Sequence, residues 1–254
     1  MSITLNGDSG ITTPTYAGTV TAEYSVPVTA FKNRIINGAM VIDQRNAGAS
    51  VTPASGGYTY TVDRWAGFAT QSSKFTVQQN AGSVSVLGST GFSNYLGITS
   101  SSSYAVISSD NFMIMQRLEG YNCSDLAWGT SSAKAVTLSF WVYSSLTGTF
   151  SGALNSYIGT AQYIFTYSIS SANTWTQISV TIPGPTSATW GTGTNACIQL
   201  SFSLGAGSSN LTTAGSWVYS GSYFGATGTT SVVGTSGATF YITGVQLEKG
   251  STAT

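Results

Sequence analysis

The chain has 254 residues, a length that suits one large β-sandwich domain or two small domains. Eight Lys or Arg residues balance eight Asp or Glu residues, and charged residues make up only 6% of the chain. This balance removes the electrostatic basis for binding nucleic acid or an anionic membrane, and an uncharged surface tends to self-associate. Met1 to Asn6 carry no basic region, and no apolar run is long enough to cross a membrane, so we expect a protein made in a cytoplasm without membrane insertion.

The first part of the chain is predicted to be an extended N-terminal arm, residues 1–32, ahead of a β-sandwich domain, residues 33–254. The apolar side chains of the arm are widely spaced and include Ile3, Leu5, Ile11 and Tyr16. They are too few to form a core of their own, yet the low charge is unlike that of most disordered tails. We therefore expect the arm to add strands to a neighbouring molecule or to a docking site.

Short runs of alternating apolar and polar residues, separated by Gly, Ser and Thr, recur through the rest of the chain. The clearest runs span residues 135–143, 163–169, 175–182 and 198–204. Alternation with a period of two indicates half-buried strands, so the pattern predicts an all-β sandwich. Residues 112–118 are also predicted to be a strand, although one helical turn is the alternative. The large apolar residues of one parity are expected in a single core: Val136, Phe140, Ile178, Val180, Leu200 and Phe202.

The last predicted strand changes its phase in the middle. Phe240 and Ile242 share one parity, whereas Val245 and Leu247 share the other, with Gly244 between the two pairs. One extra residue in a β-bulge at Gly244 would return all four apolar side chains to the core. The alternative is a strand that is buried on both faces.

A turn and several charges mark the start of the predicted domain. Asn37 and Gly38 form a turn signal, because both residue types tolerate positive φ. Four of the few charged residues then follow within a short stretch: Asp43, Arg45, Asp63 and Arg64. Either they bind a ligand, or they form a hydrogen-bonded ion network at the entry to the sandwich, which we favour. Trp65 is expected to cap the core.

The residues that catalysis needs are absent or scattered. The chain contains no histidine, which removes the usual base that activates a serine or cysteine nucleophile. Cys123 and Cys197 lack metal-ligand spacing and are expected to be buried thiols. A sugar-cleaving enzyme needs only two carboxylates and remains a weaker hypothesis. The available carboxylates are Asp110, Glu119, Asp125 and Glu248. We expect no catalytic residue, no metal and no cofactor.

Aromatic residues in Gly- and Ser-rich runs are the candidate glycan-binding residues. They are Trp190, Trp217, Tyr219 and Tyr223, with Phe224 beside them. Exposed aromatic rings stack on the apolar faces of sugars, and the surrounding small residues favour exposed loops. The alternative is that these rings close the ends of the sandwich, as large apolar groups commonly do.

Several sequence blocks resemble a family of bacteriophage tail-fibre and related virion proteins. The first block reads NRIINGAMVIDQRNAG at residues 33–48, and YTVDRW follows at residues 60–65. Further blocks read VTLSFWV at 136–142, WTQISVTIPG at 175–184 and FYITGVQLEKG at 240–250. The middle blocks are also similar to the jelly rolls of carbohydrate-binding modules.

This resemblance implies a non-catalytic virion protein with a jelly-roll β-sandwich, assembled in the host cytoplasm. It implies a tail fibre or fibre tip, commonly a homotrimer, whose arm docks on other virion proteins and whose jelly roll faces a host-surface glycan. The alternative is a capsid decoration or head-fibre protein with a purely assembly role.

Overall fold

The structure is a computed structural model that describes residues 32–252. The predicted arm, with Ile3, Leu5, Ile11 and Tyr16, lies outside the described residues. None of the helices in the described part is long and apolar enough to cross a membrane.

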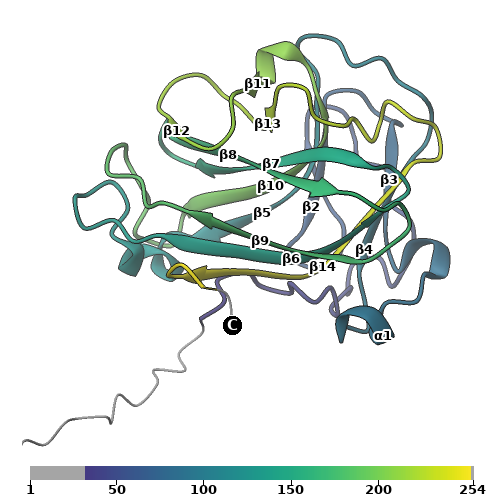
Figure 1. Ribbon diagram of the computed structural model, residues 1–254, viewed down its shortest axis with the longest axis horizontal. Coiled ribbons are helices and arrows are strands. Elements are labelled where there is room, and N and C mark those ends of the chain that lie inside the picture. The colour runs from purple at the N-terminus through teal and green to yellow at the C-terminus, as the bar shows by residue number, and fades with distance from the viewer. Residues whose placement is uncertain (1–31, 253–254) are drawn as a thin grey trace, which may run out of the picture. The chain divides into compact units, whose positions relative to one another are not determined.

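Two antiparallel sheets form the two layers of a sandwich (Figure 1). The larger sheet has the order β1 (Tyr58–Tyr60), β2 (Ala66–Ala69), β5 (Asn111–Glu119), β10 (Ala196–Ala206), β7 (Gly148–Ser156), β8 (Gln162–Ile169) and β12 (Trp217–Val218). The smaller sheet has the order β3 (Phe75–Gln79), β4 (Leu96–Ser100), β14 (Thr239–Lys249), β6 (Val136–Ser144) and β9 (Thr176–Ile182). The predicted all-β jelly-roll sandwich is confirmed, and residues 112–118 lie in a strand.

The remaining elements of the described residues are short. A two-stranded parallel pair joins β11 (Leu211–Thr212) to β13 (Gly225–Ala226). The helical segments are α1 (Leu87–Thr90) and the 3-10 turns η1 (Ala81–Ser83), η2 (Gly120–Asn122), η3 (Ser124–Leu126) and η4 (Ser208–Asn210). Because none exceeds four residues, helix contributes almost nothing to the core.

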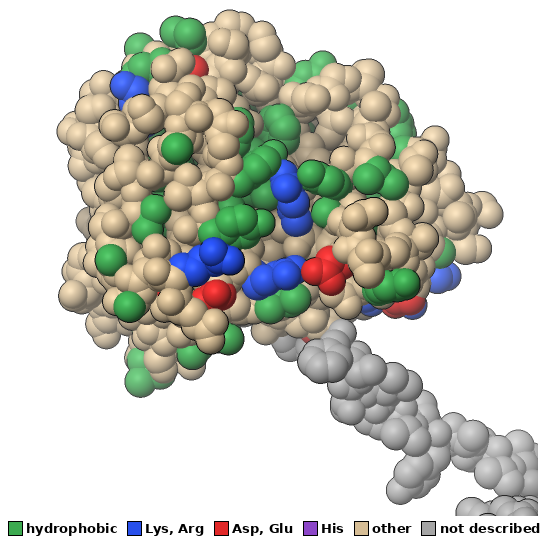
Figure 2. Space-filling model, turned by 180° about the vertical axis from the view of Figure 1, so that it is seen from behind, with side chains coloured by type: hydrophobic (Ala, Val, Ile, Leu, Met, Phe, Trp, Pro, Cys, Tyr) green, Lys and Arg blue, Asp and Glu red, His purple; other side chains and the backbone are tan. Residues whose placement is uncertain are grey.

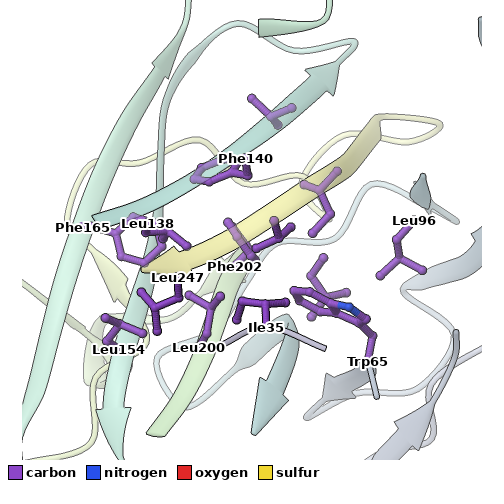
Figure 3. Packing of buried hydrophobic residues seen from close by; sticks show 14 of the residues in the cluster. Ile35, Trp65, Leu96, Leu138, Phe140, Leu154, Phe165, Leu200, Phe202 and Leu247 are labelled. Carbon is purple, nitrogen blue, oxygen red and sulfur yellow. The ribbon is translucent and has the colours of Figure 1, made fainter. Parts of the chain in front are cut away.

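The hydrophobic core fills the space between the two large sheets. Strand alternation turns Phe140 of β6 and Leu200 and Phe202 of β10 inward, where all three are buried (Figure 3). Val136 is buried in the same cluster, whereas Ile178 and Val180 are partly buried against it because β9 is an edge strand. The predicted core is therefore confirmed, and Cys123 and Cys197 are buried, free thiols within it.

The phase change in β14 is a β-bulge, as predicted. The register of β14 against β6 shifts between Thr243 and Gln246, and Gly244 has a φ of 60°. The apolar residues on both sides of the bulge are buried: Phe240, Ile242, Val245 and Leu247. A single inserted residue thus keeps one strand facing the core along its whole length.

The turn at Asn37 and Gly38, at the start of the domain, packs closely against this bulge. Asn37 adopts the left-handed conformation with a φ of 55°, and its side chain bonds the Ile42 and Asp63 carbonyl oxygens. The backbone N–H of Val245 donates to the carbonyl oxygen of Gly38 at 3.0 Å, and a side chain at position 38 would collide with that neighbour. Trp65 is fully buried and donates its Nε1 to the Asn37 carbonyl oxygen, so it lies in the core as expected.

Candidate functional site

One part of the outer face of the larger sheet is hollowed. The larger hollow, of about 790 Å³, lies over β2, β5 and the start of β10, and a smaller one of about 250 Å³ lies over β10, β7 and β8. Both are lined by Tyr157, in the loop after β7, so we treat them together as the groove. Figure 2 shows a hollow where basic, acidic and hydrophobic side chains gather on an otherwise mostly uncharged face.

The groove stays open because the rest of this outer face is covered by the chain between β10 and β14. The short strand β13 packs over β7, where the backbone N–H of Ala226 donates to the Ser151 hydroxyl at 3.1 Å. Ala226 is buried there against Ala153 and Ile164. Three residues of this covering segment, Gly221, Ser222 and Phe224, line the smaller hollow.

A row of polar side chains crosses the floor of the groove. Strand register places Arg117 of β5 opposite Gln199 of β10, Gln199 opposite Asn155 of β7, and Asn155 opposite Gln162 of β8. We call these four residues the polar row. Its three amides are more than nine-tenths buried, and the Oδ1 atom of Asn155 has no hydrogen-bond partner among the described residues.

Arg117 lies between two aromatic rings at one end of the polar row. Its guanidinium carbon is 4.0 Å from the ring centre of Tyr58 and 4.4 Å from that of Tyr157. Its Nε donates to Oε1 of Gln199 at 3.3 Å. Contacts between a guanidinium and aromatic faces are attractive, so the two rings hold the guanidinium of Arg117 in place beside the groove.

Other charged residues surround the larger hollow. Arg64 pairs with Glu119 at 3.2 Å, Arg45 lies 5.4 Å from the ring centre of Tyr60, and all four residues line the hollow. Asp63 also lines it and accepts the backbone N–H of Gln44 at 2.6 Å.

These contacts bear on the two interpretations of the early charged cluster. The carboxylate of Asp43 caps its own loop by accepting the N–H groups of Asn46 and Gly48. Within residues 32–252, no salt bridge joins Asp43, Arg45, Asp63 and Arg64 to one another. Three of the four line the groove instead, so the mutual ion network is not what the structure shows.

Two of the predicted glycan-binding residues lie outside the groove, in an aromatic cluster against the core. Trp190 and Trp217 contact Trp128 edge to face, with ring centres 4.7 and 5.6 Å away. Trp217 also donates its Nε1 to the Pro183 carbonyl oxygen at 2.7 Å. Both rings are half-buried and pack on the hydrophobic core, a placement typical of structural aromatics.

The other two predicted residues lie apart from this cluster. Tyr219 is 42% exposed and does not line the groove. Tyr223 packs against Ala153 and Ile164, and only its backbone reaches the polar row, where its carbonyl oxygen accepts from Asn155. The fold therefore does not bring the four predicted residues together, although Phe224, named beside them in the sequence, lines the smaller hollow.

Three other rings that line the groove, those of Tyr58, Tyr60 and Tyr157, were not predicted as site residues from the sequence. Tyr58 and Tyr60 point to the same side of a short strand. Tyr157 is followed by Ile158 in the loop after β7, where its side chain is 46% exposed. Arg117 is the one cation in an apolar strand. These are usable signals, but each also fits an ordinary surface strand until the sheet order is known.

Two carboxylates line the groove. Its carboxylates are Asp63 and Glu119, and both are engaged as hydrogen-bond acceptors or ion-pair partners. Glycoside hydrolysis needs one carboxyl group that donates a proton and a second that acts as nucleophile or base. Among the described residues, no three His, Cys, Asp or Glu side chains are placed to hold a metal ion.

Comparison with known proteins gives neither a matching family model nor a matching curated protein. Among solved structures, the chain is similar to the enzymatically active domain of tailspike protein 4 of Bacteriophage CBA120, at 12% identity and a TM-score of 0.42. That match covers 86% of this chain but only 22% of the tailspike structure.

Two sugar-related structures are similar over nearly their whole length. A putative sugar-binding protein from Bacteroides thetaiotaomicron matches at 12% identity and a TM-score of 0.47, covering 85% of this chain and 99% of that one. A family 11 carbohydrate-binding module from Clostridium thermocellum, in complex with a mixed-linked tetrasaccharide, matches at 12% identity and a TM-score of 0.36. That match covers 79% of this chain and 96% of the module. With scores below 0.5, none of these similarities assigns a ligand to this chain.

Proposed function

We propose that this chain is a non-catalytic bacteriophage virion protein whose jelly roll binds a host-surface glycan in the groove. The observation that carries the proposal is the groove floor, where Tyr58 and Tyr157 contact Arg117 at one end of a row of buried amide side chains. Aromatic rings stack on the C–H faces of sugars, while amides and guanidinium edges bond to hydroxyl groups. A concave site with few, convergent polar groups is the usual form of a small-ligand site.

The virion assignment is supported by the sequence blocks at residues 33–48 and 240–250, which resemble phage tail-fibre proteins. In this proposal the arm, residues 1–32, docks on a neighbouring virion protein, and the chain forms a tail fibre or fibre tip. Display of several grooves on a homotrimer would raise a weak affinity for each glycan by avidity.

The absence of catalysis is part of the proposal. Glu119 is paired with Arg64, and Asp63 accepts a backbone N–H, so no carboxyl group of the groove is placed to protonate a leaving sugar. We expect the full chain to bind oligosaccharides without shortening them, which chromatography of the recovered sugar will show.

Binding to a glycan array with the full chain and three variants tests the site. Tyr58→Ala and Tyr157→Ala remove the two rings beside Arg117 and are expected to lower binding of every bound glycan at least about tenfold, with little change in stability. Tyr219→Ala is the matched control, because Tyr219 is equally exposed but does not line the groove. Loss of binding in the control alone would place the site in the loop that the sequence suggested.

A capsid decoration or head-fibre protein is the second candidate, and one observation favours it. The block at residues 33–48 leaves Ile36, Val41 and Ile42 between 43% and 59% exposed, which suits contact with another protein. A map of intact particles with this chain labelled separates the two candidates, because a tail position supports a fibre and a lattice on the head supports decoration.

A further inference from the structure

We infer that the groove selects acidic saccharides, and that Arg117 recognises the carboxylate on the sugar. This inference rests on the proposed glycan-binding function and names its ligand class. It is carried by the charges that line the larger hollow and by the contacts that hold Arg117.

Positive charge is concentrated in the groove. Three of the eight cationic side chains of the whole sequence line the larger hollow: Arg45, Arg64 and Arg117. Two carboxylates face them, and one of these, Glu119, is already paired with Arg64. One positive charge therefore remains in excess, in a chain that is otherwise almost uncharged, and a concave surface focuses its field toward a ligand.

Arg117 differs from the arginines that serve the fold. Arg34 pairs with Asp125 at 2.8 Å, and Arg64 pairs with Glu119 at 3.2 Å. Among the described residues, no carboxylate pairs with Arg117, although its side chain is only partly exposed. A cation held in this way lacks the anionic partner that partial burial ordinarily demands.

The contacts of Arg117 leave a particular part of it for a ligand. The guanidinium carbon lies over the rings of Tyr58 and Tyr157, and Nε donates to Gln199. The terminal N–H groups remain, and their fork matches the two oxygens of a carboxylate. Because these contacts already hold the guanidinium in place, binding costs little side-chain entropy.

The rest of the polar row suits the hydroxyl groups of the same saccharide. Tyr157 lines both hollows, so a sugar chain that lies on its ring reaches Arg117 on one side and the amides on the other. Asn155 lines the smaller hollow there, and its buried Oδ1 has no hydrogen-bond partner among the described residues. The groove thus joins one carboxylate site to a neutral hydroxyl site.

Calorimetric titration with matched sugars tests the inference. The full chain is titrated with oligogalacturonate and oligomannuronate, and with the same oligosaccharides after methyl esterification, which removes the charge and keeps the ring and linkage. We expect at least one acid form to bind at least about tenfold more tightly than its ester, since a charge-assisted pair is lost. Added salt should weaken binding of the acid more than that of the ester.

Two variants place the preference on Arg117. Arg117→Gln is expected to abolish the difference between acid and ester, and Arg117→Lys, which keeps the charge but not the fork, to restore it only in part. Lys134→Gln removes the same charge from an exposed residue outside the groove and should leave the preference intact. The comparison of acid with ester in the unmodified chain stands even if an Arg117 variant fails to fold.

The possible failures are distinguishable. Equal binding of acid and ester, or an effect of Lys134→Gln on the preference as large as that of Arg117→Gln, would overturn the acidic-saccharide inference. The proposed glycan site would survive those results if Tyr58→Ala still weakened binding. No binding of any acidic sugar overturns the inference, and a glycan array without any bound sugar would overturn the proposed function as well.

Discussion

Contacts between aromatic rings hold several side chains of the core. Phe140 is 1% exposed, and its ring meets those of Phe202 and Tyr167 edge to face, with centres 4.9 and 5.1 Å away. Such geometry adds to the stabilisation that comes from burying apolar area. In the groove, by contrast, the rings of Tyr58 and Tyr157 contact Arg117 and remain partly exposed to solvent.

The core position of Phe140 leads to a stability prediction. Phe140→Ala should lower the free energy of unfolding by about 3–5 kcal/mol, because a buried ring is lost and a cavity remains. Urea unfolding monitored by tryptophan fluorescence measures this change. Tyr219→Ala, at an exposed ring, should change it by less than about 0.5 kcal/mol. A loss below about 1 kcal/mol for Phe140→Ala would contradict the core packing.

The bulge residue Gly244 leads to a second prediction. Gly244→Ala should destabilise the domain by about 1–3 kcal/mol, because φ is positive and the added Cβ would overlap the ring of Phe92. Gly237→Ala is the control, since Gly237 also has a positive φ but no atom within 4 Å of an added Cβ. Chemical unfolding of both variants should show the larger loss at Gly244, and equal losses would mean that the overlap is relieved.

At the scale of elements, one buried carboxylate joins β2, β5 and the segment that covers the outer face. Asp110 accepts from the hydroxyl groups of Thr70 and Tyr104, both at 2.9 Å, and from the backbone N–H of Ile107. Its carbonyl oxygen accepts from the side chain of Asn210, the last residue of η4. Burial raises the pKa of Asp110, but these hydrogen bonds outweigh burial and leave the pKa below its ordinary value.

This depressed pKa predicts the direction of a pH effect. An unfolded aspartate titrates at about pH 3.9, so the stabilisation from Asp110 is fully present above that pH and is lost as pH falls through the lower folded pKa. The urea concentration at the unfolding midpoint should therefore decrease as the pH is lowered through the acidic range. Asp110→Asn should flatten this dependence of the midpoint on pH.

The control for this pH effect is Asp125. Its pKa is raised by burial and lowered more by Arg34 and Lys249, with a net decrease, but its side chain is half exposed. Asp125→Asn should therefore change the curve less than Asp110→Asn, because solvent screens exposed ion pairs. An unchanged curve in Asp110→Asn would contradict the assigned role of Asp110.

At the scale of the whole molecule, the described domain closes its own core between the two sheets. Deletion of residues 1–31 should therefore leave the thermal unfolding midpoint of the domain nearly unchanged, while the truncated chain no longer enters phage particles. Calorimetry and quantification of the chain in purified particles measure the two effects. Normal incorporation of the truncated chain would show that the arm is not the attachment segment.

The fold was predictable because the local alternation of apolar and polar residues shows which face of a strand is buried. Residues that alternate along one strand face one layer, so the parity of Phe140 and Phe202 indicated the core before any strand pairing was known. The bulge at Gly244 was predictable for the same reason, since a phase change of one residue places Ile242 and Val245 on the same face. Each of these inferences uses residues a few positions apart.

The groove depended on tertiary structure. Arg117 and Gln199 are 82 positions apart and become neighbours because β5 pairs with β10, while Tyr58 and Tyr157 reach Arg117 from other segments. Local alternation says which side chains face outward, but not which strands lie side by side or which part of the outer face a later segment covers. The sequence alone therefore determined an all-β sandwich with little charge, and the order of its strands decided where that charge and the open rings meet.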